Sequence, residues 1–500
     1  MARKSRMAVV LASAAAVWAA CAGLGVAVAQ PDGVATAPGM VPTAGQVVYF
    51  KGAITLPSMA LEFSLELTRG LDGAPAGTID IPIQAFLDQP LLDLVWTDAR
   101  LAFAVALPGQ DTSVWPNFEF ALAGGDAEHV GTLKQAGMEF PALIERTEAA
   151  PEGLRRPQVP VAPFPYEARE VTFRNDAGDL TIAGTLTVPE GDGPFPCAVM
   201  ITGSGPQDRD ETIFEHRPFL VIADHLARHG IAVLRCDDRG VGGTGAGKPE
   251  SPDSLDFVTD IRAALAFVAT QDGIDAERLG LIGHSEGGLI APLVASQDER
   301  VSFVVLLAGP GVPGDEILMR QGEEIALAMG ATPSSLEEQR PVRRRLFEAV
   351  KAEDEPAARA AMVELVYLQG GASMTEEMLA AAVDAQMEAF NSRWMRTFMM
   401  HDPRPALRSV DCPVLVLNGD LDLQVLHDQN VPEVEKALRE GGNRDVTVAI
   451  LPGLNHMFQP AESGSVMEYA TIETTVDPSA LDAITAWIRS RTGLDGGAGH

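Results

Sequence analysis

The chain has 500 residues, which predicts two or three domains at roughly 100–200 residues per domain. Hydrophobic residues make up 46% and charged residues 21%, a globular composition that argues against wholesale disorder. Asp and Glu number 69 against 37 Lys and Arg, a formal net charge of -32. This excess of negative charge argues against a nucleic-acid partner and against broad docking on an anionic membrane.

The first residues have the pattern of an export signal. Three basic residues precede an apolar run over residues 7–29, and its last three residues fit a small-residue cleavage site. We expect residues 1–29 to be a signal peptide, no membrane span after its removal, and a periplasmic or extracellular protein. A transmembrane anchor is the alternative for so long a run. A second alternative is a lipid anchor on Cys21, because Ala19-Ala20-Cys21 resembles the end of a bacterial lipoprotein box.

Residues 30–45 are rich in Pro, Gly and Ala and predict a flexible tether. Short apolar runs then alternate with Gly, Asp and Pro turns over residues 46–148. Leu61–Leu67 has a strict two-residue period, typical of a strand with one buried face. This pattern predicts a small antiparallel β-domain, a barrel or a sandwich, without chemistry of its own. The five prolines within residues 149–168 predict a stiff linker.

Residues 169–495 change to apolar runs separated by helical segments. After an opening antiparallel pair, continuous apolar strands between helices predict a mostly parallel sheet covered by helices on both faces. A helical, Met-rich insertion at about 311–408 predicts a cap over the strand ends. Its aromatic residues suggest either an apolar acyl site or the core of the cap; they are Phe390, Trp394 and Phe398.

Outside the leader, the cysteines are Cys197, Cys236 and Cys412. Cys197 begins one predicted strand and Cys236 ends the next parallel strand, so the two should lie at opposite ends of the sheet. A disulfide needs Cα atoms about 5.5 Å apart, so we expect no disulfide between them. The three thiols are interpreted as small buried hydrophobic groups.

A candidate nucleophile follows one of the strands. Gly283-His284-Ser285-Glu286-Gly287 has the G-x-S-x-G pattern, and it lies between the strand Leu279–Ile282 and a predicted helix. Glycines at these positions give room for a sharp turn that exposes the hydroxyl of Ser285 at the edge of the sheet. The start of the following helix offers backbone N–H groups to a developing anion.

A serine hydroxyl needs a base, and the base needs a carboxylate to fix its tautomer. His456 lies in a loop after the last predicted strand, which makes it the candidate base. Asp420 and Asp422 both follow the strand Val414–Leu417, and either can serve. Asp422 is preferred, because the turn at Gly419 must be completed before a side chain can reach His456. The order Ser285, Asp422, His456 is that of an α/β-hydrolase.

An oxyanion hole needs one N–H after the nucleophile and one from the loop after an early strand. Glu286 supplies the first, and Ser204, which follows the strand Ala198–Ile201, is the candidate for the second. Gly240–Gly245 matches G-x-G-x-x-G, but Pro249 and Pro252 follow where a dinucleotide site needs a helix to begin at once. We therefore expect no bound dinucleotide, and the sequence predicts neither a metal site nor any other cofactor.

Several of these segments together resemble secreted bacterial carboxylesterases of the α/β-hydrolase fold. The resemblance covers nearly the whole mature chain, including the N-terminal β-region. It implies Ser285 as nucleophile, Asp422 as acid and His456 as base, and the wider superfamily includes serine aminopeptidases and dipeptidyl-peptidase-like enzymes. The segments that carry the resemblance are Gly203–Glu211, Asp238–Gly242, Gly283–Gly288, Asp402–Pro405, Leu417–Val425 and Leu451–Gln459.

The expected function is hydrolysis of a small-molecule carboxylic ester through an acyl-enzyme on Ser285. An aminopeptidase is the first alternative, but the adjacent Glu323 and Glu324 do not converge on a substrate ammonium from one helix. A non-catalytic envelope protein that binds a ligand is the second alternative. The sequence does not indicate an oligomeric state.

Overall fold

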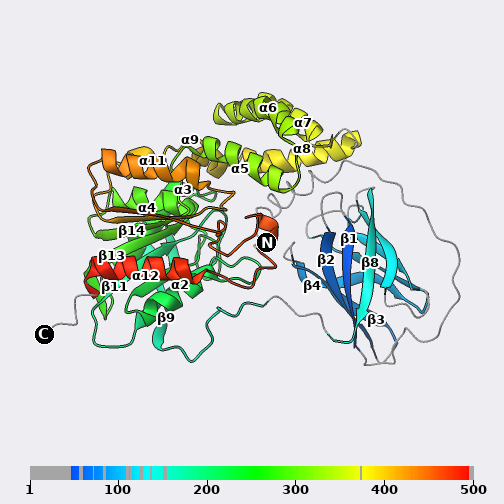
Figure 1. Ribbon diagram of the computed structural model, residues 1–500, viewed down its shortest axis with the longest axis horizontal. Helices are drawn as coiled ribbons and strands as arrows, with labels where there is room; N and C mark the ends of the chain where they lie inside the picture. Colours follow the sequence, from blue (N-terminus) through cyan, green and yellow to red (C-terminus); the bar gives the residue numbers. More distant parts are fainter. Residues whose placement is uncertain are drawn as a thin grey trace. The chain divides into compact units, whose positions relative to one another are not determined.

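The computed structural model describes residues 47–494, except 56–59, 71–72, 83–85, 108–111, 113–114, 123–127, 136–137, 150–154 and 372–373. The predicted signal peptide, the Cys21 lipid site and the tether lie outside the described residues. The chain divides into two compact units (Figure 1). We call them the barrel unit, residues 1–155 with 363–385, and the sheet unit, residues 156–362 with 386–500.

The described strands before residue 148 form a closed antiparallel barrel. Each strand pairs with the next, and β1 pairs with β8 to close the ring. Side chains alternate between buried and exposed along β2, as its two-residue period predicts. Closure also leaves no open strand edge. The strands are β1 (Val47–Thr55), β2 (Ala60–Arg69), β3 (Pro75–Ile81), β4 (Phe86–Trp96), β5 (Arg100–Val105), β6 (Asn117–Ala121), β7 (Glu128–Gln135) and β8 (Met138–Thr147).

The sheet unit contains one eight-stranded sheet in the order β16-β15-β14-β13-β11-β12-β10-β9. The strands β9 and β10 pair antiparallel, β10 is also antiparallel to β12, and the remaining pairs are parallel. This confirms the predicted mostly parallel sheet with an opening antiparallel pair. The strands are β9 (Tyr166–Asn175), β10 (Leu180–Pro189), β11 (Phe195–Ile201), β12 (Ala232–Cys236), β13 (Ile274–His284), β14 (Val301–Leu307), β15 (Val414–Gly419) and β16 (Val446–Leu451).

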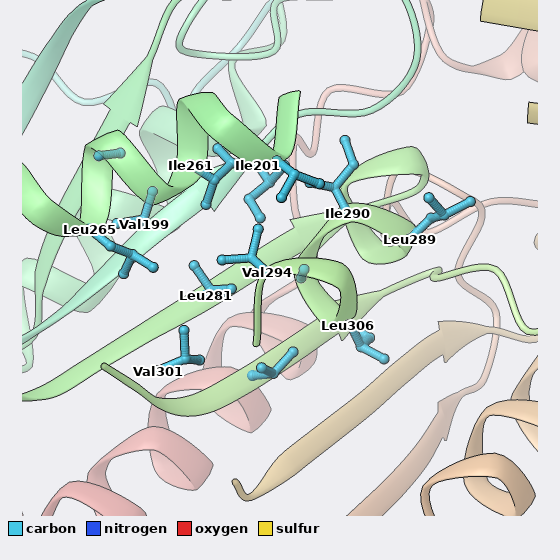
Figure 2. Close-up of a cluster of buried hydrophobic side chains, with 14 of the residues drawn as sticks. Val199, Ile201, Ile261, Leu265, Leu281, Leu289, Ile290, Val294, Val301 and Leu306 are labelled. Atoms are coloured by element: carbon cyan, nitrogen blue, oxygen red, sulfur yellow. The ribbon is translucent and has the colours of Figure 1, made fainter. Parts of the chain in front are cut away.

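Helices cover both faces of this sheet, as predicted. On one face, α3 (Ser254–Val268), α4 (Glu286–Ala295) and α11 (His427–Glu440) pack into a large apolar cluster. Figure 2 shows part of this cluster, with valine and isoleucine side chains of the central strands meeting those of α3 and α4. On the other face, α2 (Pro218–Arg228) and α12 (Pro478–Thr492) pack into a second cluster. The sheet is therefore buried on both sides, which explains its continuous apolar strands.

The predicted helical insertion lies between β14 and β15. It consists of α5 (Gly314–Ala328), α6 (Pro333–Lys351), α7 (Glu355–Leu368), α8 (Glu376–Phe390), α9 (Arg393–Met400) and α10 (Arg404–Leu407). Residues 363–385 of this insertion belong to the barrel unit and the rest belongs to the sheet unit. None of the helices described in residues 47–494 combines the length and the apolar character that a membrane crossing requires.

All three described cysteines are free, as expected. Cys197 is fully buried in β11, where burial raises the pKa of its thiol to about 12. Cys236 and Cys412 are partly buried, and burial raises the pKa of the Cys412 thiol to about 12 as well. Such thiols are protonated at neutral pH and behave as small apolar groups.

Candidate active site

Ser285 lies in the sharp turn between β13 and α4. Its backbone has φ 53° and ψ −118°, a conformation that is rare for a residue with a side chain. Its N–H donates to the carbonyl of Leu307 at 2.9 Å, which ties the turn to the neighbouring strand β14. A Cβ on Gly287 would lie 2.1 Å from the carbonyl oxygen of Ile201, so this position requires glycine. The turn therefore places Ser285 at the carboxyl edge of the sheet, as the motif predicts.

His456 and Asp422 lie together at the same edge. The ring Nδ1 of His456 donates to Asp422 Oδ2 at 2.9 Å, and both side chains are buried. The other oxygen of Asp422, Oδ1, accepts the backbone N–H groups of Gln424 and Val425 at 2.8 and 2.9 Å. With the carboxylate held in this way, the proton of neutral His456 resides on Nδ1. Its Nε2 is then free to accept a proton.

Asp420, the alternative carboxylate, is exposed and bonds to a neighbouring loop instead of to His456. Its Oδ1 accepts the backbone N–H of Gly453 at 2.6 Å, which ties the loop after β15 to the loop after β16. These loops approach so closely that a Cβ on Gly419 would lie 2.0 Å from the carbonyl oxygen of Leu454. The structure therefore pairs His456 with Asp422 and not with Asp420.

His284 fixes the position of His456 relative to the nucleophile. It precedes Ser285, its ring centroid lies 4.8 Å from that of His456, and its Nε2 donates to the His456 carbonyl at 3.0 Å. Its Nδ1 lies 3.0 Å from Glu211 Oε1. Burial alone lowers the pKa of His284, but the Glu211 carboxylate outweighs burial and raises it. Both ring nitrogens face acceptors, which favours the imidazolium form.

The two predicted oxyanion donors flank Ser285. A Cβ on Gly203 would lie 3.3 Å from the Cβ of Ser285, so the loop after β11 passes directly beside the nucleophile. The N–H of Gly203 donates to Glu211 Oε1 at 2.6 Å and is therefore occupied. Within the described residues, the backbone N–H groups of Ser204 and Glu286 are bonded to no other protein group. These two donors are available to an oxyanion.

Buried ionic contacts hold the loop that contains Ser204. Arg209 donates to the Asp237 carboxylate at 2.9 Å, and Asp210 pairs with Arg235 of β12. The carboxylate of Asp238 accepts from Thr202 Oγ1 at 2.8 Å and from the backbone N–H of Gln207 at 2.9 Å. Burial raises the pKa of Asp238 well above its usual range. The loop is therefore tied to the end of β12 and cannot adjust freely.

The Glu286 side chain is buried, with 3% of the residue exposed. Its Oε1 accepts from Ser254 Oγ at 2.5 Å and from Trp394 Nε1 at 2.8 Å. Burial raises the pKa of Glu286 above its ordinary value. A cavity of about 40 Å³ adjoins the carboxyl and is lined in part by Thr202, Asp238 and Ile290.

The aromatic residues of the insertion pack against other apolar side chains. Phe398 is buried in the apolar cluster of the sheet, and Trp394 stacks on it with ring centroids 5.5 Å apart. Phe390 stacks on Phe347 at 6.1 Å. The contact of Phe390 agrees with the predicted core of the cap, whereas Trp394 and Phe398 join the apolar cluster of the sheet.

The G-x-G-x-x-G segment lies in the loop between β12 and α3, and α3 begins only at Ser254. The loop folds around Asp237, whose Oδ2 accepts the backbone N–H of Gly243 at 2.9 Å. The glycines therefore lie in a loop and not at the start of a helix, as the prolines that follow them predict.

The sequence pattern predicted no role for His284, Glu211 or Asp238, and it predicted no hydrogen bond from Trp394 to Glu286. The place of His284 immediately before the nucleophile was a signal for its role. No spacing links Glu211 to His284, because 73 positions separate them and only the fold brings them together.

In comparisons with known proteins, the three candidate catalytic residues fall within one matched region. Residues 217–462, which include Ser285, Asp422 and His456, match a family described as serine aminopeptidase, S33. The chain is 26% identical over 379 residues to esterase EstD of Thermotoga maritima, covering 74% of this chain and 79% of that protein. It is 32% identical over 150 residues to esterase FrsA of Serratia proteamaculans, covering 30% and 33%. A solved esterase from Pyrococcus furiosus aligns with 68% of this chain and 98% of its own, at 16% identity and a TM-score of 0.41.

Proposed function

We propose that the protein hydrolyses carboxylic esters through an acyl-enzyme on Ser285, because it matches a family of serine hydrolases over residues 217–462 and is similar to an esterase over most of its length. The observation that carries the proposal is the buried pair of Asp422 and His456. His284, the residue before Ser285, donates to the His456 carbonyl and so ties this pair to the turn that contains the nucleophile. A serine becomes an effective nucleophile when such a pair can accept its proton.

In the proposed reaction, His456 Nε2 accepts the Ser285 hydroxyl proton while Oγ forms a bond to the ester carbonyl carbon. The carbonyl oxygen becomes an oxyanion, and the N–H groups of Ser204 and Glu286 donate to it. The bond to the alcohol oxygen then breaks, and His456 returns the proton to the leaving alcohol. Water, deprotonated by His456, attacks the acyl carbon and releases the acid, and Ser285 regains its proton.

The test is Ser285→Ala assayed on short p-nitrophenyl esters. We expect kcat to fall by about 10³-fold or more, because the remaining donors and binding contacts supply only residual catalysis. A fluorophosphonate should label the native protein and not the variant. Full turnover by a folded Ser285→Ala protein would contradict the proposal.

An aminopeptidase is the rival that the family description favours. Glu323 is the more buried carboxylate of the candidate pair, and both its oxygens accept from Arg340, at 2.7 and 2.9 Å. Glu324 lies 3.5 Å from Arg320. Because arginine already neutralises these carboxylates, they are poor receptors for a substrate ammonium. Hydrolysis of aminoacyl-naphthylamides without turnover of esters would favour the aminopeptidase instead.

A further inference from the structure

The mechanism proposed above uses only the backbone N–H of Glu286 and leaves its side chain unexplained. That side chain is a buried carboxyl directly after the nucleophile, where an apolar residue would be less costly. Its hydrogen-bond partners come from two separate segments. Ser254 begins α3, and Trp394 lies in α9. The buried carboxyl therefore joins the start of α3 to α9 beside the nucleophile.

Helix α9 is docked at the start of α3 by further polar contacts. Arg393 donates to Asp253 at 2.9 Å and to Asp256 at 2.8 Å, and Thr397 Oγ1 donates to Asp253 at 2.8 Å. Asp253 is itself the N-cap of α3. These contacts hold α9 near the site, and Trp394 extends from α9 to the residue that follows the nucleophile.

We propose, on the basis of the proposed function, that the Glu286 side chain is a positioning residue that couples helix α9 to the oxyanion hole. Glu286 supplies one oxyanion donor through its backbone, and the backbone of Ser204 supplies the other. The Trp394 hydrogen bond keeps this carboxyl in place. The position of the Glu286 N–H relative to the Ser204 N–H therefore depends on a contact that Trp394 of the inserted helices makes.

This arrangement predicts an effect on the transition state rather than on substrate binding. The two N–H groups act on the charge that develops on the carbonyl oxygen, so a change in their separation lowers kcat more than it raises KM. Loss of one supporting hydrogen bond should lower kcat about threefold to tenfold.

The experiment compares Trp394→Phe with Trp487→Phe in the full-length protein. Each substitution removes one indole N–H donor and keeps an aromatic ring. Trp487 donates to Thr447 Oγ1 at 3.0 Å on the opposite face of the sheet, which makes it the matched control. On a p-nitrophenyl ester, we expect kcat to fall about threefold to tenfold in Trp394→Phe with KM within about twofold, and we expect Trp487→Phe to match the native protein.

Substitutions of Glu286 complete the design. Glu286→Gln retains an acceptor for Trp394 and Ser254 and should keep most of kcat, whereas Glu286→Ala should lose at least as much as Trp394→Phe. Adding Trp394→Phe to Glu286→Ala should cause no further loss, because both remove the same bond.

Three results would each overturn the coupling. The first is a native kcat in Trp394→Phe, and the second is an equal loss of kcat in Trp394→Phe and Trp487→Phe. The third is a further loss of kcat when Trp394→Phe is added to Glu286→Ala. Ser285→Ala is assayed beside them. If it is inactive and Trp394→Phe is unaffected, only the coupling fails. If Ser285→Ala remains active, the proposed function fails and the coupling fails with it.

Discussion

At the scale of single residues, the two aspartates after β15 show how local contacts decide a role. Asp422 is buried and its carboxylate accepts from Asn418, Gln424, Val425 and His456. Asp420 lies two positions earlier, is exposed, and accepts the backbone N–H of Gly453 in the neighbouring loop. The chemistry of the side chain is the same at both positions. Because their surroundings differ, the same change from aspartate to asparagine should have very different effects on kcat at the two positions.

We expect Asp422→Asn to lower kcat on a short ester by about 10³- to 10⁴-fold. The asparagine amide would present an N–H group to His456 Nδ1 and favour the tautomer that cannot accept a proton from Ser285. Asp420→Asn keeps an acceptor for Gly453 and should retain activity within about threefold. Steady-state kinetics on both variants, with circular dichroism to confirm folding, makes the comparison. A larger loss in Asp420→Asn would assign the acid role to Asp420 instead.

His216 predicts a pH dependence of stability. It is buried, its Nε2 donates to the Tyr469 carbonyl at 3.0 Å, and its Nδ1 accepts from Thr475 Oγ1 at 2.8 Å. Burial, assisted by the charge of Arg156, lowers its pKa from 6.5 to about 4. The unfolded chain therefore binds more protons than the folded chain between these values. The stability that neutral His216 provides is complete above pH 6.5 and is lost as the pH falls towards 4.

On moving from pH 7 to pH 4.5, the native protein should lose about 2 kcal/mol more of its unfolding free energy than His216→Gln. Titration of all other groups is common to both proteins and cancels in the comparison. Urea unfolding at the two pH values, followed by circular dichroism, measures the difference. Equal losses in the two proteins would show that His216 titrates normally.

At the scale of elements, the turn from β13 to α4 depends on its glycines. A Cβ on Gly287 would meet backbone oxygens of Ile201 and Thr202 at 2.1 and 2.8 Å, and backbone cannot move aside as a side chain can. Helix α4 would have to shift away from β11, and the N–H of Glu286 would shift with it. Gly245 differs, because a Cβ there would have no neighbour closer than 3.7 Å.

Gly287→Ala should therefore lower kcat about 10²-fold or more and destabilise the fold by about 1–3 kcal/mol. Gly245→Ala should stay within about 0.5 kcal/mol of the native protein and keep its activity. Thermal unfolding and ester kinetics on both variants provide the measurement. Native activity in Gly287→Ala would mean that the turn is not as tightly packed as described.

The elements of the sheet unit were predictable because each one carries a local signal. Continuous apolar runs identified the parallel strands, and the G-x-S-x-G turn identified the start of α4. The prolines of the predicted linker misplaced one boundary. Strand β9 begins at Tyr166, inside the predicted linker, because Tyr166 is buried and pairs with Pro189.

Contacts between distant segments were not predictable from local patterns. The sequence placed Ser285, Asp422 and His456 at strand ends, since a parallel sheet gathers such ends at one edge. It gave no sign that Glu211 would lie against His284 or that Trp394 would bond to Glu286. Those pairs depend on the conformation of a loop and on the docking of an inserted helix. Neither periodicity nor spacing encodes such features.

At the scale of the whole molecule, the described core residues fall into separate clusters. The barrel has its own cluster, which includes the stacked pair Phe103 and Phe118 with ring centroids 4.8 Å apart. Two further clusters lie on the faces of the large sheet, and Phe303 of β14 is fully buried in one of them. Each unit therefore has the apolar interior that independent cooperative unfolding requires.

This separation predicts two thermal transitions, which a matched pair of substitutions can assign. Phe103→Ala and Phe303→Ala each remove a buried ring and should each cost about 3–5 kcal/mol. Phe103→Ala should lower one calorimetric transition and leave kcat/KM for an ester unchanged at 25 °C. Phe303→Ala should lower the other transition, and loss of activity on heating should follow that transition. Loss of activity in Phe103→Ala with the second transition in place would show instead that catalysis depends on an intact barrel.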